Sequence, residues 1–326
     1  MMLVLIIPHE WGHMVVARLC GVKINEFSVG MGPLLFKKKK GDTQYSVRLL
    51  PLGGYCAMEG EEESVDSPTS YSNKTYPQKI AILLAGVTMN IIIAILAVTI
   101  SLCITGVVTN TLGSVVPGSP AERAGLMAGD TITSINGQTT DSWDAVVAGV
   151  DSWKEGETLK VTYERKGTEG SVEVVPEYNE ESKSYMIGIG AGTTRNLWVC
   201  IKNGPAATWE LSKSLIQSFK MLLTGGVSKD DIAGPVGLVK VVDMAADYGI
   251  APYLMLLALV SLNLALFNLL PIPGLDGGKI FFILLKIISG GRINDDMEYK
   301  ATVAGMILLL TFFVLVTVND VMNLFG

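Results

Sequence analysis

Charged side chains are scarce in this sequence. Asp, Glu, Lys and Arg make up 17% of its 326 residues, whereas soluble domains average about 25%. Hydrophobic residues reach 49%, and 31 acidic residues outnumber 25 basic ones, which gives a net charge of −6. The hydrophobic content excludes an intrinsically disordered chain, and the acidic balance argues against a nucleic-acid partner.

Cysteine and histidine are scarcer still. Four cysteines with no Cys-x-x-Cys pair exclude both a disulfide scaffold and a cysteine-rich zinc site. The whole chain has two histidines, His9 and His13, which stand four residues apart. Any function that needs imidazole therefore depends on this one short stretch.

Three stretches without charge are long enough to cross a bilayer, which takes about 20 apolar residues. They lie at 80–121, 248–275 and 301–319, and the strongly apolar part of the first ends at residue 108. We therefore predict transmembrane segments at 80–108, 248–275 and 301–319. The remaining sequence has the Gly, Asp and Lys content of ordinary soluble protein.

Residues 1–20 form a fourth predicted membrane helix, although it carries polar groups. Apolar residues 1–7 are followed by Pro8, His9 and Glu10, and apolar residues resume at 14–17. A signal peptide would have a basic start and a small-residue cleavage site, and this segment has neither. At about 1.5 Å per residue the helix is barely long enough, so either it does not cross fully or the natural start lies upstream.

Basic residues predict the orientation. Segment 21–79 and the loop 276–300 are both rich in lysine and arginine, and such loops stay cytoplasmic. The insert between the second and third spans is then outside. We expect a multi-pass α-helical membrane protein with four transmembrane helices in a bacterial cell membrane, in contact with lipid.

Segment 21–79 is predicted to hold a β-hairpin and an acidic linker. Apolar residues alternate with polar or small ones at 27–32 and at 45–49, and the stretch 37–42 between them is typical of a turn. The hairpin is either an ordinary surface ribbon or one that is associated with the membrane, where protein or water satisfies its backbone.

The outer insert resembles a PDZ domain over residues 111–178. The pattern is Pro-Ala at 120–121, Ala-Gly-Leu at 124–126, Gly-Asp at 129–130 and Asn-Gly at 136–137, with strand-like runs around a helical stretch at 143–150. PDZ domains bind extended chain ends by adding a strand to a sheet edge. The plainer alternative is a generic small α+β module.

A linker, 179–247, follows and contains an amphipathic helix at 205–223. Leu211, Leu215, Phe219 and Leu222 share one helical stripe. The helix either lies on the membrane surface, with Trp209 at the interface, or packs on the outer module.

His9-Glu-Trp-Gly-His13 is an H-E-x-x-H motif. On a helix, positions i and i+4 share one face, so both imidazoles can bind one metal ion, and Glu10 can take a proton from a water that the metal polarises. The alternative is that both histidines are ordinary core residues that have hydrogen-bond partners and bind no metal. It is weak, because ionisable groups in a membrane segment are costly and usually functional.

A catalytic zinc ion needs a third protein ligand and an open position. With no further histidine, a carboxylate has to supply it. Glu59 and Glu63 lie in the turn-rich acidic linker, and Asp276 ends an uncharged run in Leu275-Asp-Gly-Gly278. A lone Asp at the end of a membrane segment costs free energy unless a cation is bound to it. The Asp-Gly-Gly sequence is also compatible with a simple surface turn.

Together these motifs resemble the site-2 proteases, the intramembrane zinc metalloproteases. The resemblance rests on His9–His13, on Asn268…Pro271…Leu275-Asp-Gly277, and on further motifs at 27–33, 50–55 and 234–237. It is closest to the bacterial RseP and RasP type, which acts on membrane-bound anti-sigma factors, in the form with a single PDZ domain.

The resemblance implies a set of roles. Zn²⁺ would be bound by His9, His13 and Asp276, with Glu10 as general base, and the hairpin would present substrate as an extended strand. The substrate-binding residues would be Asn263, Asn268 and Pro271. Two positions depart from the family pattern: Pro8 precedes the first ligand, and Val87 replaces an expected proline.

The sequence therefore predicts an intramembrane zinc metalloendopeptidase. It would cleave transmembrane segments of proteins already trimmed by another protease, such as anti-sigma factors or signal-peptide remnants, and the PDZ-like module would dock chain ends or filter by size. Two alternatives stay open. One is a non-catalytic membrane adaptor that uses the PDZ-like module, and the other is a membrane-anchored zincin with a solvent-facing site.

Overall fold

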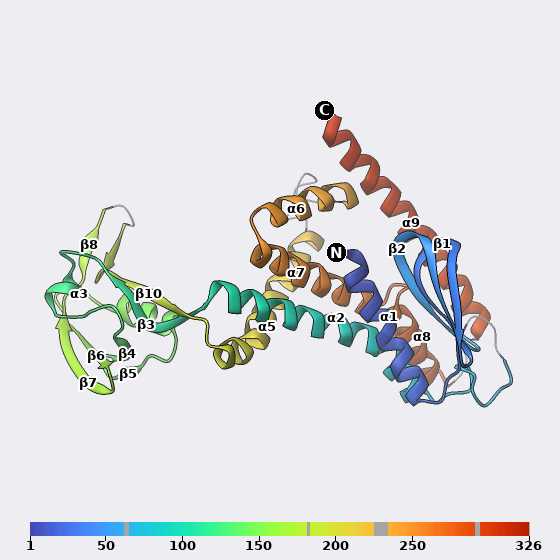
Figure 1. The fold of residues 1–326 in the computed structure, drawn as a ribbon, viewed down its shortest axis with the longest axis horizontal. Coiled ribbons are helices and arrows are strands. Elements are labelled where there is room, and N and C mark those ends of the chain that lie inside the picture. Colours follow the sequence, from blue (N-terminus) through green and yellow to red (C-terminus); the bar gives the residue numbers. More distant parts are fainter. Residues whose placement is uncertain (62–64, 181–182, 225–233, 291–293, 326) are drawn as a thin grey trace. The chain divides into compact units, whose positions relative to one another are not determined.

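The computed structural model describes residues 1–61, 65–180, 183–224, 234–290 and 294–325. The chain forms two compact units, one made of Met1–Ser101 with Gly204–Gly326 and the other of Leu102–Asn203. Figure 1 shows the helical unit at the two ends of the sequence and the strand-rich unit in its middle.

The first unit consists of helices around one small sheet. Its helices are α1 (Met2–Leu19), α2 (Tyr76–Thr105), α5 (Leu197–Leu223), α6 (Pro235–Asp247), α7 (Ile250–Leu269), α8 (Asp276–Ile288) and α9 (Asp295–Phe325), of which α2 and α5 continue into the second unit. The predicted 276–300 loop is thus largely helical. Pro8 lies inside α1 without ending it.

Three helices are long and apolar enough to cross a membrane: Tyr76–Thr105, Ile250–Leu269 and Asp296–Val318. The prediction of several membrane helices is confirmed. Helix α1 is not among the three, because Pro8, His9, Glu10, His13 and Arg18 interrupt its apolar run. A count of four spans therefore stays a prediction.

The sheet of the first unit is more folded than a simple hairpin. Strands β1 (Ile24–Lys40) and β2 (Thr43–Met58) bend, so that residues 24–29 pair with 54–58 on one side and residues 26–29 also pair with 44–47 on the other. Residues 34–40 pair with 43–48 and form an edge. The predicted turn at 37–42 is confirmed only for residues 41–42, since Lys37–Lys40 extend β1. Charged side chains are well tolerated on such an exposed edge.

One apolar cluster packs the inner part of this sheet against α1 and α2. Its buried members are Met14, Ala17, Val22, Ile24, Phe27, Cys56, Met58 and Ile82. From Met31 onward β1 is exposed. The sheet thus has a fixed inner half beside α1 and an outer half open on the surface of this unit.

Hydrogen bonds from serine side chains connect the long apolar helices. Ser261 Oγ on α7 donates to the Asn90 carbonyl on α2 at 2.7 Å, and Ser101 Oγ donates to the Ala251 carbonyl at 3.1 Å. Short hydroxyl side chains let apolar helices approach closely while they satisfy a backbone acceptor. The helix α5 also packs on protein, because Phe219 meets Phe267 of α7 edge-on at 5.9 Å.

The second unit is an α+β module of PDZ-like type. Its strands are β3 (Val107–Val115), β4 (Thr131–Ile135), β5 (Gln138–Thr139), β6 (Leu159–Arg165), β7 (Thr168–Val174), β8 (Glu177–Asn179), β9 (Ser184–Met186) and β10 (Ile189–Thr194), with helices α3 (Pro120–Arg123) and α4 (Trp143–Asp151). The main sheet has the order β10-β3-β4-β6-β7, and β5 pairs with β4. Strand β10 lies beyond residue 178, where the sequence predicts a linker, because its Gly-rich run lacks hydrophobic alternation.

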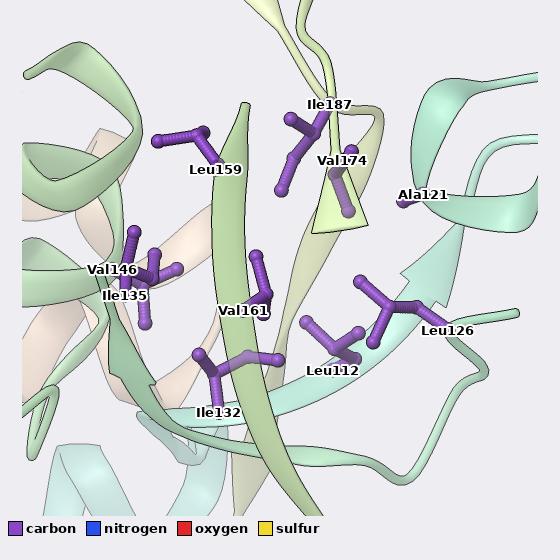
Figure 2. Close-up of a cluster of buried hydrophobic side chains, with 10 residues drawn as sticks. All are labelled: Leu112, Ala121, Leu126, Ile132, Ile135, Val146, Leu159, Val161, Val174 and Ile187. Carbon is purple, nitrogen blue, oxygen red and sulfur yellow. The ribbon is translucent and has the colours of Figure 1, made fainter. Parts of the chain in front are cut away.

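Ten buried apolar side chains form the core of this module (Figure 2). Leu112, Ile132 and Val161 point into it from three neighbouring strands, and Val146 closes it from α4. Strands β4 and β6, which are among the strand-like runs predicted around the helical stretch, supply several of these residues, so the alternation in the sequence marks the buried face.

The Gly-Asp pair of the module has a clear structural role. Gly129 has a φ of +93°, which favours glycine. Asp130 is buried and accepts hydrogen bonds from the Met127 backbone N–H at 2.8 Å and from Arg165 at 2.6 and 2.8 Å. Burial alone would raise the pKa of Asp130, but these bonds hold it below its usual value.

Candidate metal centre

Helix α1 carries both histidines on one buried face. His9 and His13 are one turn apart, with 3.1 Å between their Nε2 atoms, and their exposed fractions are 9% and 5%. Spacing i, i+4 produces this pairing on any helix. The structure therefore brings together the two residues that the sequence singles out first.

Two glycines let α1 and α2 approach closely enough to bury the imidazoles. A Cβ on Gly12 would lie 2.6 Å from the Ala85 carbonyl oxygen, and a Cβ on Gly86 would lie 2.6 Å from His9 Cε1 and overlap His13. Both distances are too short for a methyl group. The role of Gly86 is not evident from the sequence, since a glycine in an apolar helix carries no chemistry of its own.

Hydrogen bonds from α2 orient both rings. His13 Nδ1 lies 2.8 Å from the Ile82 carbonyl oxygen, so it donates there and leaves Nε2 with a free lone pair. The amide nitrogen of Asn90 lies 3.2 Å from His9 Nδ1, while its Oδ1 is buried and finds no partner among the described residues. Turning the amide over lets Oδ1 accept from Nδ1–H, which resolves the unpaired atom and frees His9 Nε2.

Asp276 enters the same site from the first turn of α8. Its Oδ2 lies 3.3 Å from His9 Nε2 and 3.4 Å from His13 Nε2. Gly277 and Gly278 allow this position of Asp276. A Cβ on Gly277 would lie 2.5 Å from the Leu269 carbonyl carbon, and a Cβ on Gly278 would lie 2.7 Å from the Ile272 carbonyl carbon, both too close for a methyl group. The Asp-Gly-Gly sequence is thus a close contact between α8 and the preceding turn.

The three side chains fit a zinc ion. Their ligand atoms all lie within 4.8 Å of one another, and Asp276 Oδ2 is a buried oxygen without a hydrogen-bond donor in the described part of the chain. Tetrahedral coordination with bonds near 2.05 Å puts ligand atoms about 3.3 Å apart. The observed separations of 3.1, 3.3 and 3.4 Å match that spacing.

The other carboxylates that the sequence leaves open as ligands lie elsewhere. Glu59 accepts hydrogen bonds from Lys23 at 3.2 Å, from Ser67 at 3.3 Å and from Thr69 at 2.5 Å. Glu63 lies outside the described residues. Among the described residues the metal-type cluster contains Asp276 and no Glu.

Glu10 faces the inner part of the sheet. A Cβ on Gly54 of β2 would lie 3.7 Å from Glu10 Cγ, so the strand backbone passes directly beside this carboxylate. Asn263 and Asn268 are half-buried on α7, and Pro271 is exposed in the turn before α8. None of these last three forms a hydrogen bond with the His–Asp cluster in the described ranges, and their part in binding substrate stays a prediction.

Comparison with known proteins shows the family. The model of peptidase family M50 matches residues 1–312. The chain belongs to peptidase family M50. A relative from Clostridium acetobutylicum is 37% identical over 320 residues, covering 98% of this chain and 94% of that protein. The regulator of sigma-W protease RasP of Bacillus subtilis is 28% identical over 407 residues, covering 98% of this chain and 96% of RasP.

This M50 peptidase is a RasP-like zinc metalloprotease with helices long and apolar enough to cross a membrane and a PDZ-like α+β unit. The predicted family, enzyme class and Zn²⁺ cofactor are confirmed. Among solved structures, the PDZ domain of the SdrC-like protein from Listeria monocytogenes aligns with 26% of this chain and 85% of its own, at 27% identity and a TM-score of 0.23.

Proposed function

We propose that this M50 peptidase hydrolyses peptide bonds inside the transmembrane segments of other proteins. One observation carries the proposal: the H-E-x-x-H helix, whose histidines meet Asp276, packs against α2, and the composition of α2 is that of a membrane span. A hydrolytic site built onto a membrane helix is within reach of substrates in the bilayer. The bacterial relatives support a location in the cell membrane.

In this proposal His9, His13 and Asp276 hold the zinc ion. Zinc supplies a Lewis acid that polarises a peptide carbonyl and lowers the pKa of a water towards neutrality. The Ile82 carbonyl and the Asn90 amide hold the two rings with Nε2 turned to the ion. Such outer bonds keep a histidine in the correct tautomer and raise its strength as a ligand.

Glu10 acts as the proton carrier. Its place next to His9, on the helix that bears both imidazoles, puts it within reach of the water that attacks the peptide bond. It takes a proton from that water and later passes it to the leaving amine, so that one carboxylate serves as base and then as acid.

A helical substrate has to unwind before cleavage, because its carbonyls are engaged in its own hydrogen bonds. An extended strand can instead pair with a sheet edge. Support comes from the passage of β2 beside Glu10 and from the exposed edge at residues 34–40. Asn263, Asn268 and Pro271 are proposed to hold the substrate backbone.

The second unit is proposed to dock chain ends left by an earlier cut outside the membrane, or to exclude proteins that have not been cut. Membrane-bound anti-sigma factors and signal-peptide remnants are the proposed substrate classes. The name of the RasP relative, which refers to a sigma factor, is consistent with the first class. Membership of M50 favours an enzyme over a non-catalytic adaptor.

The test compares Glu10→Gln with the unchanged protein in membranes that contain a model substrate of one transmembrane helix. We expect cleavage to fall by at least about 100-fold, as for the loss of a general base, with zinc content unchanged. Glu169→Gln, an exposed change on β7, is the control. Full cleavage by Glu10→Gln, or cuts confined to segments outside the bilayer, would contradict the proposal.

A further inference from the structure

Helices α2 and α5 come unusually close at one level. A Cβ on Gly204 of α5 would overlap the Thr99 hydroxyl and lie 3.4 Å from Thr99 Cα on α2. Only glycine permits this approach, and the backbones of the two helices are nearly in contact there. The helices are antiparallel along the chain at this point, since α2 leads into the strand-rich segment and α5 returns from it.

One helical turn from this contact, each helix carries a cysteine. Cys103 follows Thr99 by four residues and Cys200 precedes Gly204 by four, so both lie on the faces that meet. The Cys103 and Cys200 thiols lie near enough to interact with each other. Both thiols are free, Cys200 is fully buried and Cys103 is partly exposed.

We propose that Cys103 and Cys200 are a disulfide-forming pair that fastens the two chain connections of the PDZ-like unit to each other. A disulfide needs α-carbons within about 7 Å and side chains directed at one another. The close approach at Gly204 brings the two helix backbones together, and the neighbouring thiols are directed at one another. The proposal is independent of the metal centre and of the proposed substrates.

The chemistry is a dithiol–disulfide exchange with a disulfide oxidant, such as oxidised glutathione or an oxidised thiol oxidoreductase. Cys103, the exposed partner, attacks the oxidant as a thiolate; a mixed disulfide forms and one thiol of the oxidant leaves. Cys200 then attacks Cys103 Sγ, which releases the second thiol. Two cysteine thiols are oxidised, one disulfide is reduced to two thiols, and both cysteine protons end on the products.

The predicted orientation favours this reaction. It puts the end of α2 and the start of α5 on the outer side of the membrane, where disulfides persist, and puts Cys20 and Cys56 on the other side. The bridge would turn the whole segment from Cys103 to Cys200 into a closed ring. Cutting the chain inside that ring would then leave both parts covalently joined.

That consequence gives a direct test on the full-length protein in detergent. A recognition sequence for a site-specific endoprotease is inserted between Lys166 and Gly167, the exposed turn between β6 and β7. After treatment with oxidised glutathione and cleavage, we expect one band on a non-reducing gel and two fragments after dithiothreitol. Peptide mapping should find Cys103 and Cys200 in one cross-linked peptide.

Variants separate this bridge from other oxidation products. Cys103→Ser and Cys200→Ser should each give two fragments with or without reductant, whereas the control Cys20→Ser should behave like the unchanged protein. Two fragments from the oxidised unchanged protein would overturn the proposal. So would glutathione adducts on Cys103 with no intramolecular cross-link, and neither result depends on whether a variant folds.

Discussion

Lys279 Nζ lies 2.6 Å from Glu61 Oε1, although the two residues stand far apart in the sequence. Lys279 is on the first turn of α8, three residues after Asp276, and Glu61 follows the end of β2. The ion pair therefore connects the segment that follows β2 in the sequence to the helix that carries the proposed third ligand. Both side chains are partly shielded, with exposed fractions of 35% and 18%.

This pair predicts that charge reversal is rescued by a second reversal. Glu61→Lys and Lys279→Glu should each lower the free energy of unfolding, because two like charges then meet in a shielded place. The double variant should recover, with a coupling energy of about 0.5–3 kcal/mol, typical of residues in contact. Reversal of the exposed pair Asp296–Lys300 is the control. If the losses in free energy of unfolding were additive in the double variant, the ion pair would not contribute to stability.

Gly86→Ala should damage the metal centre without altering a single polar group. The new methyl group would overlap both imidazoles, and overpacking of this kind costs about 1–3 kcal/mol. We expect a lower melting temperature together with loss of bound zinc, measured by elemental analysis. Thr88→Ala, an exposed change two residues along α2, should keep its zinc. Full zinc content in Gly86→Ala would show that the rings have room to move.

Asn90→Ala should weaken zinc binding rather than abolish it. The change removes the bond that orients His9, and loss of such an outer bond typically costs 10- to about 100-fold in metal affinity. The measurement is zinc competition with a chelator of known affinity. Asn203→Ala, which removes an amide that bonds to Val199 within its own helix, is the control. Equal zinc affinity in both variants would contradict the orienting role.

The second unit should lose stability in acid through Asp130. The pKa of Asp130 in the folded protein is held below the usual value. Its contribution to the free energy of unfolding is therefore complete above about pH 5. It is lost as the pH falls below about 3.9, because the unfolded chain binds the proton at a higher pH than the folded protein does. Asp130→Asn should cost about 1.5–3 kcal/mol at neutral pH and little at low pH. Hydrogen exchange of amides in β4 and β6 measures this; a pH-independent loss would oppose it.

The sequence predicts the ligand helix well because its chemistry is local. His9 and His13 share a face on any α-helix, so their pairing needs no tertiary information. Asp276 is less secure from sequence alone, because Glu59 and Glu63 satisfy the same chemical requirement. The family resemblance favours Asp276, and the structure supplies the physical reason, which is the glycine contact that brings α8 to the imidazoles.

What the sequence misses depends on contacts between distant segments. The roles of Gly12 and Gly86 arise only where α1 crosses α2, and the Ile82 carbonyl that orients His13 is a backbone atom present at every position. The bent sheet escapes prediction for a similar reason. Alternation at 27–32 and 45–49 gives two strands, but nothing local indicates that residues 26–29 pair on both sides.

The distribution of the His–Asp cluster along the chain sets an order of events during synthesis. His9 and His13 are synthesised long before Asp276. Until α8 is made and Asp276 meets the histidines of α1, the cluster lacks its carboxylate. With the proposed ligand set, a nascent chain without α8 would hold an incomplete metal site and should not cleave the other proteins that share its route into the membrane.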